Sequence, residues 1–368
     1  MDAALKEDDN NNNPKEMLSN LRASSLAFRW DTLQKKTGDI PQPGPKEILI
    51  KLHASSLNYR DLVSTSDQYP LPIKEGGVIP TSDGAGEVVG LGQGSTLWAK
   101  GDRVVSIFNR DHLYGSTPTA EEFGTGFGNA IDGFLTQYAV VPETAVVRIP
   151  EYLSFEEAAT LSCAAVTAWN GLYGIESESL KPGQTVLVQG TGGVSIFALQ
   201  IALAAGANVI STSSSQDKFD KVMQALEPTH RSRVQFINYT KVKEWGKEAV
   251  KLNNGKGLDF VVEIGGAGTV QQSFEAIKMG GLIANIGHRA AAGDEGVPHV
   301  PYLALSKGVI FRGTLIGSRQ QFLDLLRTFE ANKIKPVIDR EFSFEDVPKA
   351  YEYLSSGSHV GKIVIKIP

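Results

Sequence analysis

A glycine-rich turn in the middle of the chain has the residue types and spacing that bind a phosphate. The run Gly190-Thr191-Gly192-Gly193-Val194-Ser195 follows an apolar, β-branched segment, Thr185–Gln189, and leads into an apolar helical segment. Glycines let the backbone turn tightly and approach the phosphates, and a helix N-terminus offers N–H groups and a partial positive charge. Ser195 replaces the third glycine of the usual G-x-G-x-x-G pattern and is small enough for close helix–strand packing. We therefore expect a dinucleotide pyrophosphate here; a purely structural turn is the alternative.

The end of the next predicted strand bears on which nicotinamide cofactor is bound. An NAD site usually has an acidic residue there, which holds the ribose 2′-hydroxyl. In this chain the strand Asn208–Thr212 runs into Ser213, Ser214 and Ser215, and Lys218 follows as a counter-charge for a 2′-phosphate. The same serines would also cap the following helix, and the two roles are compatible. We expect NADP(H).

Glycines also follow two later strands. Glu263-Ile264-Gly265-Gly266 comes at the end of the apolar run Leu258–Glu263, and Ile286-Gly287-His288 at the end of Leu282–Ile286. The carboxyl ends of parallel strands are where ligands bind in an open α/β sheet. We expect Gly265, Ile286 and Gly287 to lie on the nicotinamide side of the cofactor, with turns that bind nothing as the simpler alternative.

The elements that would position these residues alternate between strands and helices from Thr185 onwards, which predicts a doubly wound parallel sheet, the Rossmann arrangement. The helices are expected near 194–205, 218–226 and 270–279. The first half reads as short β segments cut by Gly and Pro, such as Glu47–His53, followed by a long polar loop at 109–132. An Ala-rich helix is expected at 158–173, after a loose capping box at Ser154, and a last strand at 362–367.

Composition excludes several classes of protein. The chain has 368 residues, enough for two domains, and a net charge of -5, which disfavours a nucleic-acid or anionic-membrane partner. No apolar run reaches the length of a membrane span. The single cysteine, Cys163, cannot form a disulfide within the chain and fits a reducing compartment, so a cytoplasmic protein is the default. Residues 1–16 are acidic and Asn-rich, and we expect a disordered tail there.

These motifs together resemble the medium-chain dehydrogenase/reductase superfamily, specifically its zinc-independent, quinone-oxidoreductase-like branch. The resemblance runs from about Pro43 to Ile367 and adds five motifs to the glycine-rich turn: Ser56-Leu57-Asn58-Tyr59-Arg60-Asp61, Asp83-Gly84-Ala85-Gly86-Glu87-Val88-Val89, Lys100-Gly101-Asp102-Arg103-Val104, Ala164-Ala165-Val166-Thr167-Ala168-Trp169 and Val360-Gly361-Lys362-Ile363-Val364. It implies an α/β protein in which a GroES-like, β-rich substrate domain accompanies the Rossmann domain, and a homodimer. The implied boundaries are 17–154 with 319–368 returning for the substrate domain, and 155–318 for the NADP-binding domain. The opening strand typical of the family is not recognisable before residue 40.

The resemblance also bears on metal. Zinc-dependent members place a cysteine where Asn58 stands and a histidine near Ser82, and both ligands are missing here. Cys163 lies near the third ligand position, but one thiolate cannot hold a catalytic zinc, which needs three protein ligands. We expect no metal, and Cys163 as a small buried hydrophobe.

Roles for individual residues follow from the same resemblance. Three residues are expected to line the nicotinamide end of the cleft and to take part in catalysis: Asn58, Tyr59 and Asp61. The others are expected to bind the cofactor: Thr167 and Gly265, Ile286 and Gly287 at the nicotinamide, Gly190, Thr191, Gly192, Gly193 and Val194 at the pyrophosphate, Ser213, Ser214, Lys218 and Tyr239 at the 2′-phosphate, and Lys362 from the C-terminal segment.

A metal-free site suits a conjugated acceptor better than a simple ketone, because it lacks a Lewis acid to stabilise an oxyanion. The first hypothesis is therefore an NADPH-dependent reductase of a small-molecule quinone or enone, with the Tyr59 hydroxyl, the Asn58 amide or water as hydrogen-bond donor. One alternative is an alcohol or aldehyde dehydrogenase that binds zinc unconventionally. Another is a cofactor-binding protein without turnover.

Overall fold

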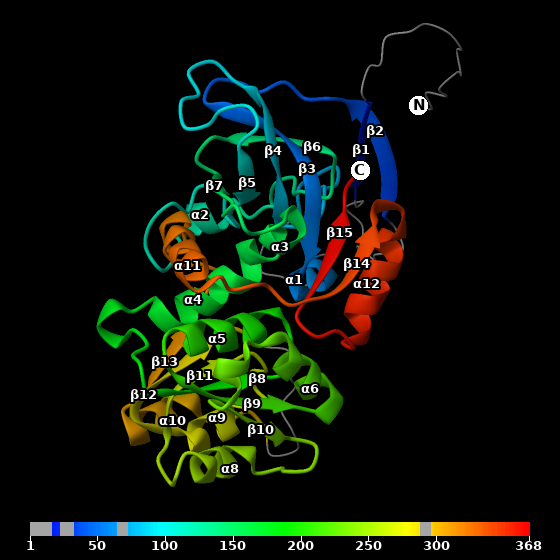
Figure 1. The fold of residues 1–368 in the computed structure, drawn as a ribbon. Helices are drawn as coiled ribbons and strands as arrows, with labels where there is room; N and C mark the ends of the chain where they lie inside the picture. The colour runs from blue at the N-terminus through cyan, green and yellow to red at the C-terminus, as the bar shows by residue number, and fades with distance from the viewer. Residues whose placement is uncertain (1–16, 23–32, 65–72, 288–295) are drawn as a thin grey trace, which may run out of the picture.

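The computed structural model describes residues 17–22, 33–64, 73–287 and 296–368, and for 17–22 the backbone alone. Two large sheets dominate this part of the chain, one above the other in Figure 1. The predicted tail at 1–16 lies outside the described residues. None of the described helices is long and apolar enough to cross a membrane.

The lower sheet in Figure 1 has six strands in the order β10-β9-β8-β11-β12-β13, and every neighbouring pair is parallel. This confirms the predicted doubly wound sheet. Its strands are β8 (Thr185–Gln189), β9 (Asn208–Ser213), β10 (Val234–Asn238), β11 (Leu258–Glu263), β12 (Ile277–Asn285) and β13 (Ile310–Gly313). The connecting helices are α5 (Gly193–Ala204), α6 (Gln216–Ala225), α7 (Pro228–Arg231), α8 (Trp245–Leu252), α9 (Val270–Ala276) and α10 (Val300–Lys307).

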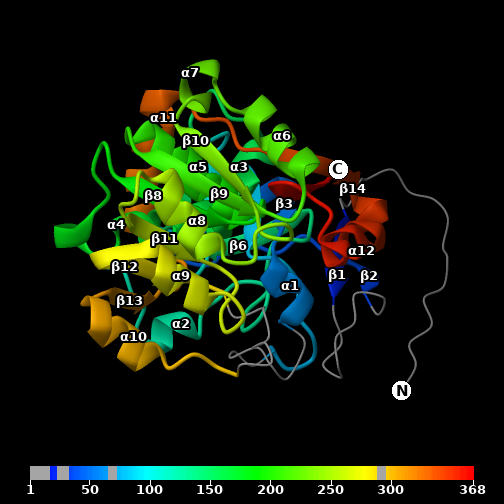
Figure 2. The same cartoon turned by 90° about the horizontal axis from the view of Figure 1, so that it is seen from below.

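Both faces of this sheet are covered, which explains why the three central residues of β8, Val186 to Val188, are all apolar. Val186 and Val188 point into the core shared with α5, whereas Leu187 between them joins a second cluster with α8, α9 and α10. Side chains alternate between the two faces of a strand, so a strand buried on both sides needs apolar residues throughout. Figure 2, seen from below, shows these helices around the sheet.

The upper sheet is mostly antiparallel and joins the two ends of the chain. Its order is β14-β15-β3-β4-β5-β7, with β6 paired to β3. The strands are β3 (Glu47–Leu57), β4 (Asp83–Leu91), β5 (Arg103–Ser106), β6 (Tyr138–Pro142), β7 (Val146–Arg148), β14 (Ile338–Ser343) and β15 (Lys362–Lys366). The remaining helical segments nearby are α1 (Tyr59–Val63), α2 (Ala120–Phe123), η4 (Phe344–Asp346) and α12 (Val347–Ser356). The C-terminal segment therefore returns to the sheet that the N-terminal half builds.

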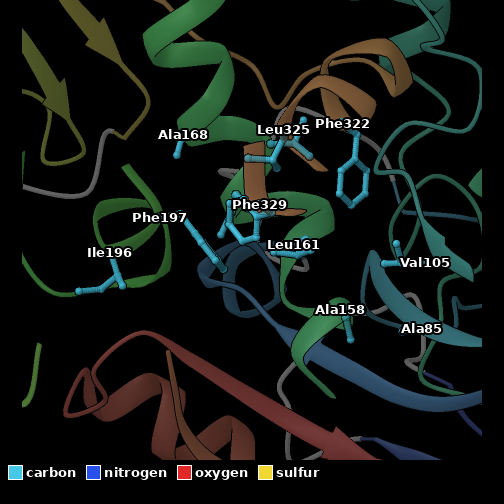
Figure 3. Close-up of a cluster of buried hydrophobic side chains, with 14 of the residues drawn as sticks. Ala85, Val105, Ala158, Leu161, Ala168, Ile196, Phe197, Phe322, Leu325 and Phe329 are labelled. Carbon is cyan, nitrogen blue, oxygen red and sulfur yellow. The ribbon is translucent and has the colours of Figure 1, made fainter. Parts of the chain in front are cut away.

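Helices between the sheets fill the space that separates them. They are α3 (Phe155–Ala159), a π-helical turn (Leu161–Ala165), α4 (Val166–Tyr173) and α11 (Arg319–Asn332). The short η3 (Glu176–Glu178) follows α4 and is exposed. Ala85 and Val105 of the upper sheet share one buried cluster with Ala158 on α3 and with Phe197 on α5, which packs against Phe329 at 6.1 Å between ring centroids (Figure 3). One continuous core therefore joins the two sheets.

Several predicted boundaries are wrong. The helix predicted near 270–279 ends at Ala276, because the buried Ile277 already pairs with Leu258 in the sheet. The helix predicted at 158–173 begins at Phe155 and contains the π-helical turn. Its capping box is regular rather than loose, since the Ser154 and Glu157 side chains each accept the other's backbone N–H.

The opening strand that the sequence did not reveal is present. β1 (Met17–Arg22) pairs antiparallel with β2 (Gln34–Asp39) in a small separate sheet. All six residues of β2 are exposed, so the strand lacks the alternation of buried and exposed positions that makes a strand recognisable. β14 was not predicted either, because it has no fully buried residue and so lacks the same alternation.

Candidate functional site

The glycine-rich turn has the geometry that an anion needs. Gly190 has a φ of 73°, which favours glycine, and Gly192 is the N-cap of α5 without any side-chain capping bond. A Cβ at Gly192 would meet no heavy atom within 4 Å. The Ser195 hydroxyl donates to the Gln189 carbonyl at 2.6 Å, so it fastens helix to strand and leaves the phosphate side clear. The turn therefore fits a pyrophosphate.

The C-terminal segment reaches this turn directly. The Gly361 N–H donates to the Thr191 carbonyl at 2.8 Å, and Gly192 and Gly361 form an isolated bridge. A Cβ at Gly193 would lie 2.7 Å from Cδ of Lys362. Position 193 therefore needs glycine because the aliphatic part of the Lys362 side chain packs over the start of α5. The sequence pattern predicts a different reason, namely that the backbone approaches a phosphate.

The residues predicted to hold a 2′-phosphate gather at the end of β9. The Tyr239 N–H donates to the Ser213 carbonyl at 3.2 Å, and the Ser213 hydroxyl accepts from the Ser215 N–H at 3.3 Å. Ser215 caps α6 by accepting a hydrogen bond from the Lys218 N–H, which agrees with the prediction that these serines cap the following helix. Ser214 is exposed. No carboxylate follows β9 directly.

Lys218 has a partner that the sequence did not reveal. Its Nζ donates to the carbonyl of Gly357, at the end of α12, at 2.6 Å. Burial lowers the pKa of Lys218 from its ordinary value. An ammonium group has three donors, so this bond leaves donors for a phosphate while it fixes where the head group lies.

The buried carboxylate of Glu263, which was not among the predicted site residues, holds the loops on the nicotinamide side. Glu263, fully buried at the end of β11, accepts from the N–H groups of Gly265 and Gly266 at 2.7 and 2.9 Å, from Thr269 at 2.6 Å and from Gln189 at 2.7 Å, and also from Ser273. The signal was an acidic residue that ends an otherwise apolar strand just before two glycines.

This loop lies beside the other predicted cofactor positions. A Cβ at Gly190 would be 3.9 Å from Cδ1 of Ile264, and a Cβ at Gly287 only 1.8 Å from the Ile264 carbonyl oxygen. The Ile286 N–H donates to the Glu263 carbonyl at 2.8 Å. The glycines after β8, β11 and β12 therefore meet at one edge of the sheet, as the sequence predicted.

Thr167 is less accessible than predicted for a residue that contacts nicotinamide. It is 2 % exposed, and its hydroxyl donates to the Cys163 carbonyl at 2.7 Å across the π-helical turn. Gly171, one helical turn further along α4, packs against Ile286, with 3.8 Å between a built Cβ and Cδ1. This places the Thr167 side of α4 against the nicotinamide-side loops.

A buried polar cluster stands at the junction between the two sheets. Asn58 donates through Nδ2 to Oδ2 of Asp83 at 2.9 Å and accepts through Oδ1 from the ammonium of Lys362. The same ammonium donates to the Leu57 carbonyl at 2.7 Å. Both ends of the Asn58 amide are therefore engaged within the protein, whereas Tyr59, next in the chain, is 39 % exposed.

Asp61 extends this cluster along α1. Its Oδ2 accepts the Asn58 N–H at 2.8 Å, and Oδ1 lies 3.5 Å from Nη1 of Arg60, which in turn donates to the Phe127 carbonyl. Desolvation raises the pKa of Asp61 from 3.8 to about 6 despite the nearby guanidinium. The structure thus brings Asn58, Asp61 and Lys362 together, with Asp83 as the member that the sequence did not single out.

The raised pKa of Asp61 predicts how stability depends on pH. The folded protein holds this proton more tightly than the unfolded chain, so the free energy of unfolding should fall by about 3 kcal/mol as pH rises from about 3 to about 7. Asp61→Asn keeps an acceptor for the Asn58 N–H and removes the titration. Urea denaturation across this range should show a flatter pH dependence for the variant, and identical profiles for the two proteins would contradict the prediction.

The side chains in this cluster do not fit a catalytic zinc. In the described ranges no three His, Cys, Asp or Glu side chains converge as metal ligands do. Cys163 is 8 % exposed, and burial raises the pKa of its thiol well above the usual range, which disfavours the thiolate that binds metal. The Lys362 ammonium lies 3.6 Å from Oδ2 of Asp83, so this buried carboxylate already has a cationic partner.

Known proteins share this arrangement of domains. Family models match residues 44–151, described as "Alcohol dehydrogenase GroES-like domain", and residues 234–365, described as "Zinc-binding dehydrogenase". A zinc-type alcohol dehydrogenase-like protein of Schizosaccharomyces pombe is 45% identical over 313 residues, which cover 84% of this chain and 88% of that protein. Acryloyl-coenzyme A reductase of Metallosphaera sedula is 29% identical over 316 residues, 83% and 88% of the two chains. The crystal structure of an NAD-dependent alcohol dehydrogenase, 28% identical, superposes with a TM-score of 0.80 over 95% of this chain and 100% of that one.

Proposed function

The chain belongs to the medium-chain dehydrogenase/reductase superfamily, and from this premise we propose that it is an NADPH-dependent reductase of quinones or α,β-unsaturated carbonyl compounds that works without zinc. The observation that carries the proposal is the Asn58–Asp83–Lys362 cluster, in which an ammonium is the partner of the buried Asp83 carboxylate and an amide stands where zinc-dependent members place a cysteine. We assign residues 17–154 and 319–368 to the substrate domain and 155–318 to the cofactor domain. The cytoplasm is our proposed compartment, in keeping with one buried cysteine.

In this proposal one group of residues binds the cofactor and another polarises the substrate. Bound NADPH would supply a hydride. Backbone N–H groups at the start of α5 would hold its pyrophosphate, and Ser213, Tyr239 and Lys218 its 2′-phosphate. Tyr59, which begins α1 and is 39 % exposed, would donate a hydrogen bond from its hydroxyl to the acceptor oxygen as negative charge spreads over the conjugated system. Asn58 is held by its neighbours and would orient this end of the cleft.

Steady-state oxidation of NADPH with quinones, enones and aldehydes in parallel tests this function. We expect turnover with quinones or enones, little with simple aldehydes, and a higher kcat/KM with NADPH than with NADH. Activity confined to aldehydes together with one zinc per chain would favour an alcohol dehydrogenase. Cofactor binding without turnover across the whole panel would favour a non-catalytic protein.

Ser213→Asp should reverse the cofactor preference. The new carboxylate would stand where the 2′-phosphate is expected, and we predict that KM for NADPH rises about 10- to 100-fold while KM for NADH changes little. The fold should tolerate the change, because an Asp oxygen can still accept the Ser215 N–H. Ser213→Asn is the control for size without charge. An equal rise in KM for NADPH and for NADH would contradict the assignment of Ser213 to the 2′-phosphate site.

The edge of the Rossmann sheet is the proposed homodimer contact. β13 ends the strand order, and within the described ranges its outer edge pairs with no strand. Nearby on α10, Tyr302 and Leu305 are 64 % and 80 % exposed, more than large apolar side chains usually are in a monomer. Sedimentation velocity should give a dimer, and Leu305→Glu should shift it toward monomer. A wild-type monomer at micromolar concentration would overturn this proposal.

A further inference from the structure

Lys362 is a cation enclosed at the junction between the two sheets. The residue is 3 % exposed, and it begins β15, the strand that pairs with β3 (Figure 1). Its ammonium donates to the Leu57 carbonyl at 2.7 Å and to Oδ1 of Asn58, and lies 3.6 Å from Oδ2 of Asp83. Two hydrogen bonds and one ion pair therefore hold the ammonium group, all of them to oxygen atoms.

The charges of Lys362 and Asp83 compensate each other across Asn58. Asp83 is fully buried, and its other oxygen accepts from the Ser82 hydroxyl at 2.7 Å. A buried ion that loses its partner is strongly destabilising, whereas an intact pair is close to neutral relative to apolar residues. The two side chains therefore form one charge-balanced unit.

This unit fixes which way the Asn58 amide faces. Its carbonyl oxygen meets the ammonium and its NH₂ group meets the carboxylate. Rotation of the amide by 180° would place NH₂ against the ammonium and the carbonyl against the carboxylate, so both contacts would become repulsive. The orientation of Asn58, and through the backbone the start of α1 with Tyr59, depends on a lysine that is 304 residues away in sequence.

The stem of the same lysine packs on the phosphate-binding turn. A Cβ at Gly193 would lie 2.7 Å from its Cδ, and the preceding residue, Gly361, donates its N–H to the Thr191 carbonyl. The ammonium, however, faces Asn58 and Asp83 rather than Gly192. The family resemblance predicts that this lysine reaches the cofactor; in the structure its charged group contacts Leu57, Asn58 and Asp83, which belong to the first sheet and the loop after β3.

We infer that Lys362 is a positioning residue: it is a built-in cation that orients Asn58 and the start of α1 and that supplies the positive charge that balances the buried Asp83 carboxylate. Asp83 and the Asn58 carbonyl offer oxygen ligands, but a divalent cation between them would stand next to the ammonium. The cluster therefore takes up no metal while Lys362 is present. Only the activity readout of this inference rests on the proposed reductase function.

A double-mutant cycle tests it. Lys362→Met keeps the stem against Gly193 and removes the charge, and Asp83→Asn removes the opposite charge. Lys366→Met, on the same strand, is the matched control, because Lys366 pairs with Glu341 in an ion pair that is 54% and 40% exposed. Melting temperature, NADPH affinity by fluorescence, kcat and zinc content after dialysis against zinc are measured for each protein.

We expect Lys362→Met and Asp83→Asn each to melt several degrees below the wild type, and the double variant of these two residues to recover most of that loss. kcat should fall about 100-fold in Lys362→Met and should stay low in the double variant, because a misoriented Asn58 remains. NADPH affinity should change less than about threefold, zinc should stay well below one per chain in the wild type, and Lys366→Met should resemble the wild type.

Three outcomes would overturn the inference. Additive melting losses in the double variant would show that the two charges do not form a unit. A large loss of NADPH affinity with unchanged kcat would make Lys362 a cofactor ligand instead. One tightly bound zinc in the wild type would show that the ammonium does not exclude metal. If no substrate in the panel is turned over, the melting temperatures and the zinc content still test the inference about Lys362.

Discussion

Gly192→Asp should weaken NADPH binding by about 100-fold while the folded protein stays as stable as the wild type. Gly192 is the N-cap of α5, with φ −78° and ψ 177°, a conformation that Asp adopts readily, and a built Cβ meets nothing within 4 Å. An Asp side chain there can accept the N–H groups that the helix leaves to an anion, so the helix gains a cap. The same carboxylate would stand where the pyrophosphate is expected, and like charges about 4 Å apart repel by about 1 kcal/mol in bulk water and about 4 kcal/mol at an effective dielectric constant of 20. A tenfold loss beyond the effect of bulk, about 1.4 kcal/mol, lies near the lower end of this range.

Fluorescence titration with NADPH and thermal melting together test this prediction. Gly192→Asn is the matched control, because asparagine caps a helix as well as aspartate does but carries no charge. We expect the Asn variant to lose about tenfold in affinity through bulk alone, and both variants to melt at or slightly above the wild-type temperature. Wild-type affinity in the Asp variant would mean that the turn at 190–195 binds no phosphate.

Local patterns in the sequence were sufficient to predict the cofactor half of the molecule. The strand before Gly190, the glycines and the helix after them are contiguous, and a strand buried on both faces is apolar throughout, so β8 and α5 could be recognised from the order of residues alone. The glycines after β11 and β12 could be placed at the same edge because parallel strands share a direction. Short exposed strands such as β2 carry no such pattern.

The polar interior of the site could not be predicted in the same way. Lys362, Asn58 and Asp83 come from three strands or strand ends that meet only when the C-terminal segment joins the first sheet. The family resemblance assigned roles to Asn58 and Lys362 but none to Asp83, and it did not reveal that the Asn58 amide is already engaged at both ends. Hydrogen-bond partners of this kind depend on distances of a few tenths of an ångström, which sequence spacing does not determine.

Glu263→Ala should lower the free energy of unfolding by about 3 to 5 kcal/mol, the largest stability loss that we predict for a single residue outside the apolar core. Five donors converge on this buried carboxylate: the backbone N–H groups of Gly265 and Gly266, and the side chains of Thr269, Gln189 and Ser273. Removal of the carboxylate leaves all five without that acceptor in the interior. Each buried donor that loses its acceptor costs roughly 1 to 3 kcal/mol, reduced here because the loop can relax and admit water.

The loss should extend to the cofactor, because the loop that Glu263 holds touches the phosphate-binding turn through Ile264. We expect urea denaturation and NADPH titration to show both effects in Glu263→Ala. Glu263→Gln should lose less stability, about 1 to 2 kcal/mol, since one oxygen still accepts while the new NH₂ group faces the donor of Gln189. Glu244→Ala, which removes an exposed carboxylate paired with Lys247, should stay within about 0.5 kcal/mol of the wild type. If Glu263→Ala were no less stable than Glu244→Ala, the hydrogen bonds around Glu263 would not be what orders the nicotinamide-side loop.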